Sequence, residues 1–237
     1  MTRTVAVVQA RLGSRRFPEK MLATLGSASL LEWVVTRVKK SRLLDRVIVA
    51  TTTETRDDRL VSECQRLSVE TYRGSTDDVL GRFVGALAGD TCDTVVRICA
   101  DNPFVDPNCV DTAITEHRSL GKQYTFNHRP YGACDYADGF GAEVISRGVL
   151  EELNGMSLSR AHREHVTLAI VEGVVNVDMH GCRAPTALAY PNMLFDVDRP
   201  EDLEAANHLV VAGSLTFDSN AEQFVTEFRR VRSSRLA

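Results

Sequence analysis

The chain has 237 residues, of which 43% are hydrophobic and 25% charged, as expected for one domain with or without a small appendage. A formal net charge of −4 argues against a general nucleic-acid binder. We find neither an apolar run near the roughly 18 residues of a membrane span nor the layout of a signal peptide, and we expect a cytoplasmic protein. The six cysteines include no C-x-x-C pair, so their spacing predicts free thiols rather than zinc ligands or disulfides.

The first predicted strand, at residues 5–8, runs into a basic loop. The strand is a short, β-branched apolar run that ends at a glycine-containing turn. Four cations follow it: Arg11, Arg15, Arg16 and Lys20. Gly13 and Ser14 let backbone N–H groups approach an anion, while guanidinium and ammonium groups bind phosphate oxygens. We interpret this as a phosphate-binding loop, although it is neither a Walker loop nor a dinucleotide turn. The alternative is a solvated basic loop.

Strand and helix patterns alternate along most of the chain. Helices are predicted around 30–38, 57–67, 77–87 and 160–172 and from Pro200, and further strands at 45–50, 69–72, 94–98, 142–145, 174–179 and 193–195. Such alternation predicts βαβ units in an α/β fold, a mostly parallel sheet with helices on both faces. Ligands of these sheets bind at the carboxyl ends of the strands, so we expect the basic loop, residues 51–53 and residues 99–104 to meet there.

The alternation fails between residues 124 and 140. We predict a main domain over 1–212, with 124–140 as an arm or lid, and a C-terminal unit over 213–237 with a short helix at 221–228 and a basic tail. Long connections in compact domains are usually functional or disordered. This one carries many aromatics, which suit an interface: Tyr124, Phe126, Tyr131, Tyr136 and Phe140. We therefore predict a homodimer paired through the arm, with a lid over the protein's own site as the alternative.

Two aspartates follow predicted strand ends. Asp101 comes after the strand at 94–98, in a loop stiffened by Pro103 and Pro107, and Asp198 precedes the helix that begins at Pro200. A phosphate-binding loop with carboxylates at neighbouring strand ends suits Mg²⁺ held against a nucleotide. The alternatives are a turn-capping role for Asp101 and a helix N-cap for Asp198.

Several motifs in order resemble those of the cytidylyltransferases. They are A-R-x-G-S-x-R-x-P-x-K over 10–20, D-x-P-F-x-D-P over 101–107 and D-x-P-E-D-L over 198–203. This group includes CMP-Kdo synthetases and acylneuraminate cytidylyltransferases. The spore-coat polysaccharide biosynthesis (SpsF-like) branch looks nearest, through G-S-x-D-D-V-L-x-R over 74–82, D-G-x-x-x-E-V over 138–144 and R-E-H-V-T over 163–167. The resemblance implies a Rossmann-like three-layer α/β/α nucleotidyltransferase fold with a mixed sheet and a dimerisation arm.

The resemblance also implies an activity and a site. CMP would pass from CTP to a small anionic acceptor, a sugar acid or a phospho or phosphono compound, with release of pyrophosphate, in polysaccharide, glycoconjugate or natural-product biosynthesis. The catalytic residues would be Arg11, Arg15, Lys20 and Asp101. The nucleotide would contact Ala10, Arg11, Gly13, Ser14, Arg15, Lys20, Thr51, Thr52, Thr53, Arg97 and Asp101. Mg²⁺ would be held by Asp101 and Asp198. The acceptor would contact Asn127, Arg129, Asp138, Glu143, Arg163 and His165.

Two residues depart from the family pattern, and two other functions stay open. Glu19 and Ala100 stand where the family usually has glycine. Asp196-Val197-Asp198 is formally a D-x-D, the motif with which metal-dependent glycosyltransferases hold a sugar nucleotide. The other alternative is a non-catalytic nucleotide-binding regulator. Release of pyrophosphate from CTP separates the three functions.

Overall fold

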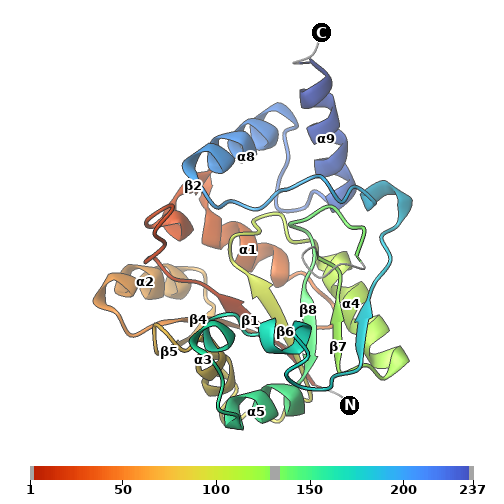
Figure 1. The fold of residues 1–237 in the computed structure, drawn as a ribbon. Coiled ribbons are helices and arrows are strands. Elements are labelled where there is room, and N and C mark those ends of the chain that lie inside the picture. Colours follow the sequence, from red (N-terminus) through yellow and green to blue (C-terminus); the bar gives the residue numbers. More distant parts are fainter. Residues whose placement is uncertain (1–2, 129–133, 235–237) are drawn as a thin grey trace.

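A seven-stranded mixed sheet forms the centre of the fold (Figure 1). The computed structural model describes residues 3–128 and 134–234. The strand order is β5-β4-β1-β6-β8-β7-β9. The bounds are β1 (Thr4–Gln9), β4 (Arg46–Thr52), β5 (Glu70–Gly74), β6 (Thr94–Cys99), β7 (Tyr124–Phe126), β8 (Glu143–Ser146) and β9 (Met179–Gly181). Only β8 runs antiparallel to its neighbours, which confirms the mixed, mostly parallel sheet within the described residues.

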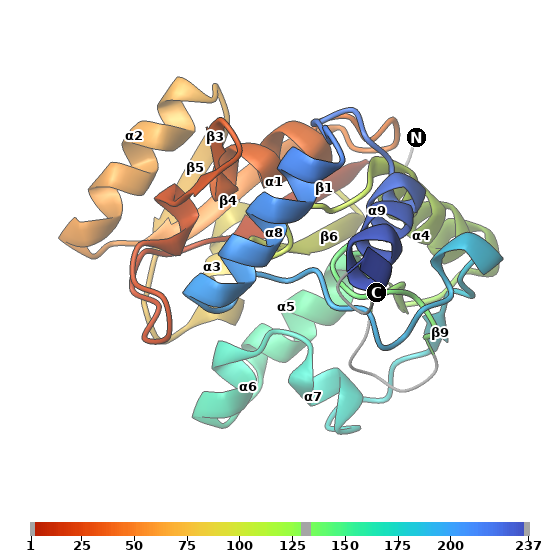
Figure 2. The same cartoon turned by 90° about the horizontal axis from the view of Figure 1, so that it is seen from above.

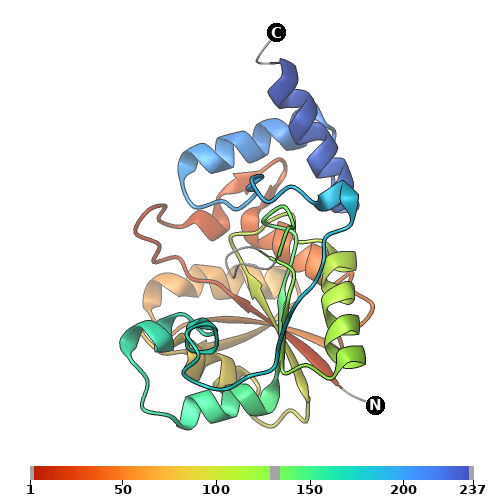
Figure 3. The same ribbon diagram turned by 45° about the vertical axis from the view of Figure 1, so that its right-hand side comes forward.

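Helices cover both faces of the sheet, as predicted. On one face lie α1 (Leu30–Val38), α2 (Asp58–Arg66), α4 (Pro107–Leu120), α8 (Pro200–Ala212) and α9 (Ala221–Ser234). On the other lie α3 (Val79–Ala86), α5 (Arg147–Gly155), α6 (Arg160–Glu164) and α7 (Leu168–Val171). A small hairpin, β2 (Thr24–Leu25) with β3 (Ala28–Ser29), and three 3₁₀ turns, η1 (Lys20–Leu22), η2 (Thr55–Asp57) and η3 (Thr186–Leu188), complete the elements. Figures 2 and 3 show the three layers.

The apolar run of β1 serves both faces of the sheet. Val5 and Val7 pack on the α3 side, Ala6 and Val8 on the α1 side, and all four are fully buried. A strand buried on both faces reads as a continuous apolar run. Gln9 lies in register with Ala50 of β4 and with Cys99 of β6, so the carboxyl ends of these three strands are aligned. The predicted meeting of the three loops that follow them is confirmed.

Several predicted elements differ from the observed ones. Helices α4 and α5 were not predicted, and the expected helix at 160–172 is divided into α6 and α7. The expected strand at 174–179 is reduced to β9 at 179–181. Residues 193–195 form an isolated bridge, between Leu194 and Asp138, instead of a strand. Apolar residues of these stretches are partly solvent-exposed, at 41% for Val174, 46% for Met179 and 53% for Leu194, so their β-like sequence does not reflect burial in a sheet.

Four of the five aromatics of the segment 124–140 lie in the core instead of on an arm. Tyr124 and Phe126 lie in β7. These two residues, Tyr136 and Phe140 are each at most 4% exposed and belong to the core of the protomer itself. Tyr131 lies outside the described residues. The argument from these four aromatics to an interface is therefore wrong, and the homodimer stays a prediction.

The C-terminal unit belongs to the main core. The helix expected at 221–228 extends to Ser234, so Arg229, Arg230 and Arg232 of the expected basic tail lie within α9. Arg235 lies outside the described residues. Phe224 of α9 stacks on Phe104, with ring centroids 4.2 Å apart. The fully buried Arg37 donates to the carbonyl oxygens of Val105 and Ser219, at 2.8 and 2.7 Å. In the described part of the chain, all helices are too short or too polar to cross a membrane.

Candidate functional site

One buried aspartate fixes the start of the basic loop. Asp57 is 1% exposed, and its carboxylate accepts a hydrogen bond from the Leu12 N–H at 2.8 Å. The same carboxylate accepts from the hydroxyl of Thr51 at 3.1 Å and from the hydroxyl and N–H of Thr52. Asp57 therefore joins the loop after β1 to the end of β4. Sequence reasoning missed this residue, because nothing local distinguishes it from a helix-start aspartate.

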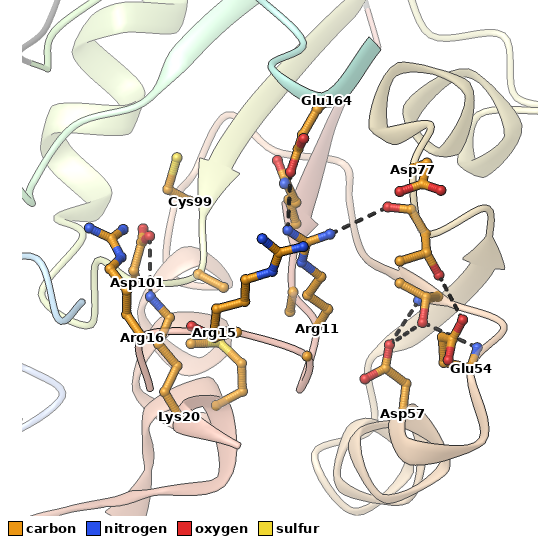
Figure 4. A pocket seen from close by; sticks show the side chains of 18 of the residues that line it. Arg11, Arg15, Arg16, Lys20, Glu54, Asp57, Asp77, Cys99, Asp101 and Glu164 are labelled. Atoms are coloured by element: carbon orange, nitrogen blue, oxygen red, sulfur yellow. Dashed lines mark hydrogen bonds and ion pairs between the residues drawn. The ribbon is translucent and has the colours of Figure 1, made fainter. Parts of the chain in front are cut away.

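The three strand ends surround a cavity of about 880 Å³, large enough for a nucleotide and a small second substrate (Figure 4). Most of the predicted nucleotide-binding residues line it: Ala10, Arg11, Gly13, Ser14, Arg15, Lys20, Thr52, Arg97 and Asp101. Thr51 lies fully buried behind the wall, and the exposed Thr53 lies outside the lining. Sequence reasoning missed further lining residues that come from later elements: Glu54, Arg56, Asp57, Thr76, Asp77 and Arg160. Cys99, the first residue of the segment predicted to meet the basic loop, and Glu164, from the R-E-H-V-T motif, also line the cavity.

The arginines of the basic loop face carboxylates across the cavity. Arg11 forms an ion pair with Glu164 of α6 at 3.3 Å, and Arg16 with Asp198 at 2.6 Å. The Arg15 side chain extends into the pocket in Figure 4, and it meets no hydrogen-bond or ion-pair partner among residues 3–128 and 134–234. A phosphate group that enters the cavity would meet the unengaged guanidinium of Arg15. It could also replace the carboxylate partners of Arg11 and Arg16.

Lys20 joins the basic loop to both predicted metal-binding aspartates. Its ammonium group lies 3.1 Å from Asp198, 3.5 Å from Asp101 and 2.9 Å from the carbonyl oxygen of Val197. Lys20 is only 9% exposed, so it is not a freely solvated loop residue. The N-cap alternative for Asp198 is wrong, because the N-cap of α8 is Arg199. The Asp202 carboxylate accepts from the N–H of Asp198, at 2.9 Å, and from the next N–H. The Asp198 carboxylate is thereby left to face the cavity.

The acidic side of the cavity is suited to a divalent cation. Burial raises the pKa of the Asp196 carboxyl, and the neighbouring Asp138, Asp101 and Asp198 raise it further. The carboxylates of Asp101 and Asp198 both converge on one cation, the Lys20 ammonium. Two carboxylates that approach a common point are a donor set that Mg²⁺ accepts, with phosphate oxygens and waters as its other ligands. The residues present fit the predicted metal.

The structure separates the predicted acceptor-binding residues. His165 lines the cavity. Asn127 is fully buried, and its amide bonds two backbone groups at 2.6 and 2.8 Å, which is a structural role. Arg163 pairs with Asp78 and lies outside the cavity lining, and Asp138 belongs to the acidic cluster around Asp196. Arg129 lies outside the described residues.

Glu143 was predicted to contact the acceptor, but it is fully buried beneath the cavity wall. Its carboxylate pairs with Arg97 at 2.8 Å and with His128 at 2.7 Å. Burial alone would raise the pKa of this carboxyl, but Arg97 and His128 outweigh it and lower the pKa to about 2. Arg97 itself lines the cavity. Glu143 therefore orients Arg97 instead of meeting a substrate.

The thiol in the cavity is not a nucleophile. Burial raises the pKa of the Cys99 thiol to about 12. Arg97 lowers this pKa, but the negative charges of Asp101, Glu143 and Asp138 raise it. The thiolate, which is the reactive form, is therefore scarce near neutral pH. What remains is a set of cations beside a pair of carboxylates, an arrangement that serves phosphoryl transfer by positioning and charge neutralisation.

A sequence model described as "Cytidylyltransferase" matches residues 5–224 of the chain. The chain belongs to the cytidylyltransferase family. The spore coat polysaccharide biosynthesis protein SpsF of Bacillus subtilis is 31% identical over 230 residues, which cover 94% of this chain and 93% of that protein. The predicted family, near the spore-coat branch, is confirmed, and the chain is a nucleotidyltransferase.

Solved structures agree with the fold of this cytidylyltransferase. A cytidylyltransferase from Leptospira borgpetersenii superposes with a TM-score of 0.87 at 22% sequence identity. The superposition covers 100% of this chain and 96% of the Leptospira chain. A CMP:2-keto-3-deoxy-manno-octonic acid synthetase, solved as a complex with CTP, gives a TM-score of 0.68 at 18% identity and covers 90% and 100% of the two chains. The predicted α/β nucleotidyltransferase fold is confirmed.

One departure from the family pattern places a side chain on strained backbone. Glu19 of this cytidylyltransferase has φ 59° and ψ 15°, the left-handed conformation that favours glycine. Its carboxylate forms an exposed ion pair with Arg59. Ala100, the other departure, is not among the described residues with positive φ, so alanine is accommodated there.

Glu19→Gly is expected to stabilise the protein by about 1 kcal/mol, because glycine removes the left-handed penalty while an exposed ion pair contributes little. Urea denaturation measures the effect. Glu19→Ala is the matched control, since it removes the same ion pair and keeps the strained φ. Equal stability of the two variants would show that the backbone conformation carries no cost.

Proposed function

We propose that the protein transfers CMP from CTP to a small anionic acceptor and releases pyrophosphate. The observation that carries this proposal is that Arg11, Arg15 and Lys20 line one cavity together with Asp101 and Asp198, which Lys20 contacts. A triphosphate needs such a set of cations, and a metal ion bridging phosphate oxygens needs such a pair of carboxylates. The synthetase of similar fold was solved in complex with CTP, which supports the choice of nucleotide.

The chain's own residues position the reactants and neutralise charge. An acceptor oxygen forms a bond to the α-phosphorus while the bond between that phosphorus and the bridging oxygen breaks, and pyrophosphate leaves with the electron pair. Arg11, Arg15 and Lys20 stabilise the charge that develops on the leaving group. Asp101 and Asp198 would hold Mg²⁺, which when bound withdraws charge from the phosphate oxygens.

The residues that line the cavity outside the basic loop favour an anionic acceptor. Arg97, Arg160 and His165 line the cavity without belonging to the basic loop. Arg97 is held in place by the buried Glu143, so its orientation is set before a substrate arrives. A preorganised guanidinium binds a carboxylate or phosphonate group at low entropic cost. Sugar acids and phosphorylated or phosphonate compounds are therefore the classes to test.

A pyrophosphate-release screen tests the proposed function. CTP, UTP, dTTP, ATP and GTP are each offered with a panel of sugar acids, sugar phosphates and phosphonates. We expect release with CTP and one acidic acceptor class. Selectivity for UTP or dTTP would overturn the cytosine assignment. Consumption of a nucleotide sugar without pyrophosphate would indicate a glycosyltransferase, and binding without turnover would indicate a regulator.

Asp198→Asn is expected to raise the Mg²⁺ concentration for half-maximal turnover by about 10- to 100-fold, because it removes one charged oxygen ligand. Chelation by EDTA should stop turnover of the unmutated protein. Nucleotide-dependent Mn²⁺ binding, followed by electron paramagnetic resonance, measures the metal without relying on activity. The control is Asp218→Asn, a surface aspartate paired with Lys40. An unchanged metal requirement in Asp198→Asn would remove this residue from the metal site.

A further inference from the structure

Three metal-ligating side chains from distant parts of the sequence meet outside the cavity. They are Glu116 of α4, His180 of β9 and Cys182, which follows β9, and one ligand atom of each lies within 4.8 Å of the other two. The imidazole Nε2 of His180 is 2.7 Å from the Glu116 carboxylate. None of the three lines the nucleotide cavity. The proposed transfer reaction leaves this trio unused.

The local structure explains why the trio forms. Residues two apart on an extended chain share a face, so His180 and Cys182 point the same way. The Cys182 N–H donates to the carbonyl oxygen of Phe126 at 2.9 Å, which holds this stretch against β7. Helix α4 packs against β7 and supplies Glu116. The spacing of the cysteines did not reveal this trio, because Glu116 lies 64 and 66 residues from the other two members along the chain.

We propose that Glu116, His180 and Cys182 bind a zinc ion. Thiolate, imidazole and carboxylate are the ligand types that Zn²⁺ takes, and a thiolate with a carboxylate balances its charge. Bond lengths of about 2.0–2.3 Å in a tetrahedron put ligand atoms about 3.3–3.8 Å apart, so the trio needs only small shifts. On binding, the thiol proton leaves to solvent as the sulfur–zinc bond forms, and water completes the coordination.

Other roles for these residues fit the structure less well. Cys182 is fully buried, so it cannot act as a nucleophile toward a substrate in solution. His180 and Glu116 are about one-third exposed at 29% and 33% of their side chains, which gives an ion a way in.

The ion would act on the structure rather than on the chemistry. β9 is the last strand of the sheet and pairs with β7 alone among the described strands. A zinc ion would fasten this edge strand to α4. The chain beyond Cys182 leads to Asp196 and Asp198 of the acidic cluster, so the cross-link would anchor one end of the segment that carries them.

Titration with Co²⁺, a spectroscopic substitute for Zn²⁺, tests the site without any substrate. We expect one equivalent of Co²⁺ to produce a sulfur-to-metal charge-transfer band that Zn²⁺ abolishes, and zinc to raise the melting temperature. His180→Ala, on the sheet edge, should fold and should weaken zinc binding more than about 100-fold. Cys182→Ala should lose the band.

Two controls separate this site from the other thiols and from the nucleotide cavity. Cys64→Ala removes a fully buried thiol in α2 and should keep the band. Asp198→Asn should also keep it, so the outcome does not depend on the proposed transfer reaction. Absence of the band in the unmutated protein, or undiminished zinc binding by His180→Ala, would overturn the proposal.

Discussion

Lys20→Met is expected to lower the rate of pyrophosphate release by about 10²- to 10³-fold, the usual cost of removing one preorganised charge-stabilising group. Lys20 is 9% exposed, and its ammonium group lies against Asp198 and Asp101. In this shielded position, a charge on the leaving phosphates is stabilised more strongly than it would be in water. Methionine keeps most of the apolar stem of the side chain and removes the charge, together with the hydrogen bond to the carbonyl oxygen of Val197.

Stability must be measured on the same variant, because Lys20 is not a solvated loop residue. Asp101 and Asp198 keep side-chain exposures of 36% and 27%, so both remain hydrated without the ammonium. We therefore expect the fold to survive. Lys122→Met is the matched control, since Lys122 forms an ion pair with Asp178 away from the cavity. A Lys20→Met variant that is folded and near-normal in turnover would exclude Lys20 from catalysis.

Glu143→Gln is expected to lower the free energy of unfolding by about 3–5 kcal/mol, because it leaves the charge of Arg97 in the interior without its partner. Both groups are well removed from water, with side-chain exposures of 0% for Glu143 and 15% for Arg97. Urea denaturation at neutral pH measures the change. Glu151→Gln breaks an ion pair in which the carboxylate is 53% exposed, and it should cost less than about 1 kcal/mol.

The same pair gives a pH dependence with a definite sign. The pKa of Glu143 is lowered from 4.5 to about 2 in the folded protein, so the folded state holds the ionised form more strongly than the unfolded chain does. Its contribution is complete above pH 4.5 and is lost as the pH falls toward 2. Unmutated protein and Glu143→Gln should therefore converge in stability over this range. Parallel pH profiles would contradict the assignment.

The sequence predicted the parts of the site that depend on strand ends. An apolar strand followed by cations, and Asp101 placed after a later strand, fix a location once the sheet is known to be mostly parallel. The strand predicted before Asp198 is an isolated bridge, yet Asp198 reaches the same location. Lys20 contacts both Asp101 and Asp198, so the basic loop, the loop after β6 and the segment before α8 do meet. Helix α4 could also have been predicted from its end signals. Asp106 caps its N-terminus, Pro107 is its first residue, and Gly121 ends it in the left-handed conformation.

The roles of buried polar residues were not predictable from the sequence. Asn127 and Glu143 look like ligands in a loop-rich segment, yet both are fully buried and bind groups of the protein itself. Burial depends on which elements pack above a residue, and local sequence does not contain that information. Arg56 and Thr76 reach the cavity through tertiary packing in the same way, although the sequence reasoning gave neither of them a role.

The most direct test of the account is a product balance from CTP labelled in the cytosine ring. CTP is incubated with Mg²⁺ and the active acceptor class, and the labelled product and inorganic pyrophosphate are quantified together. The account predicts one CMP ester of the acceptor for each pyrophosphate released, with both lost in Lys20→Met. Cleavage of CTP to CDP and phosphate, or labelled product formed without pyrophosphate, would contradict attack on the α-phosphate.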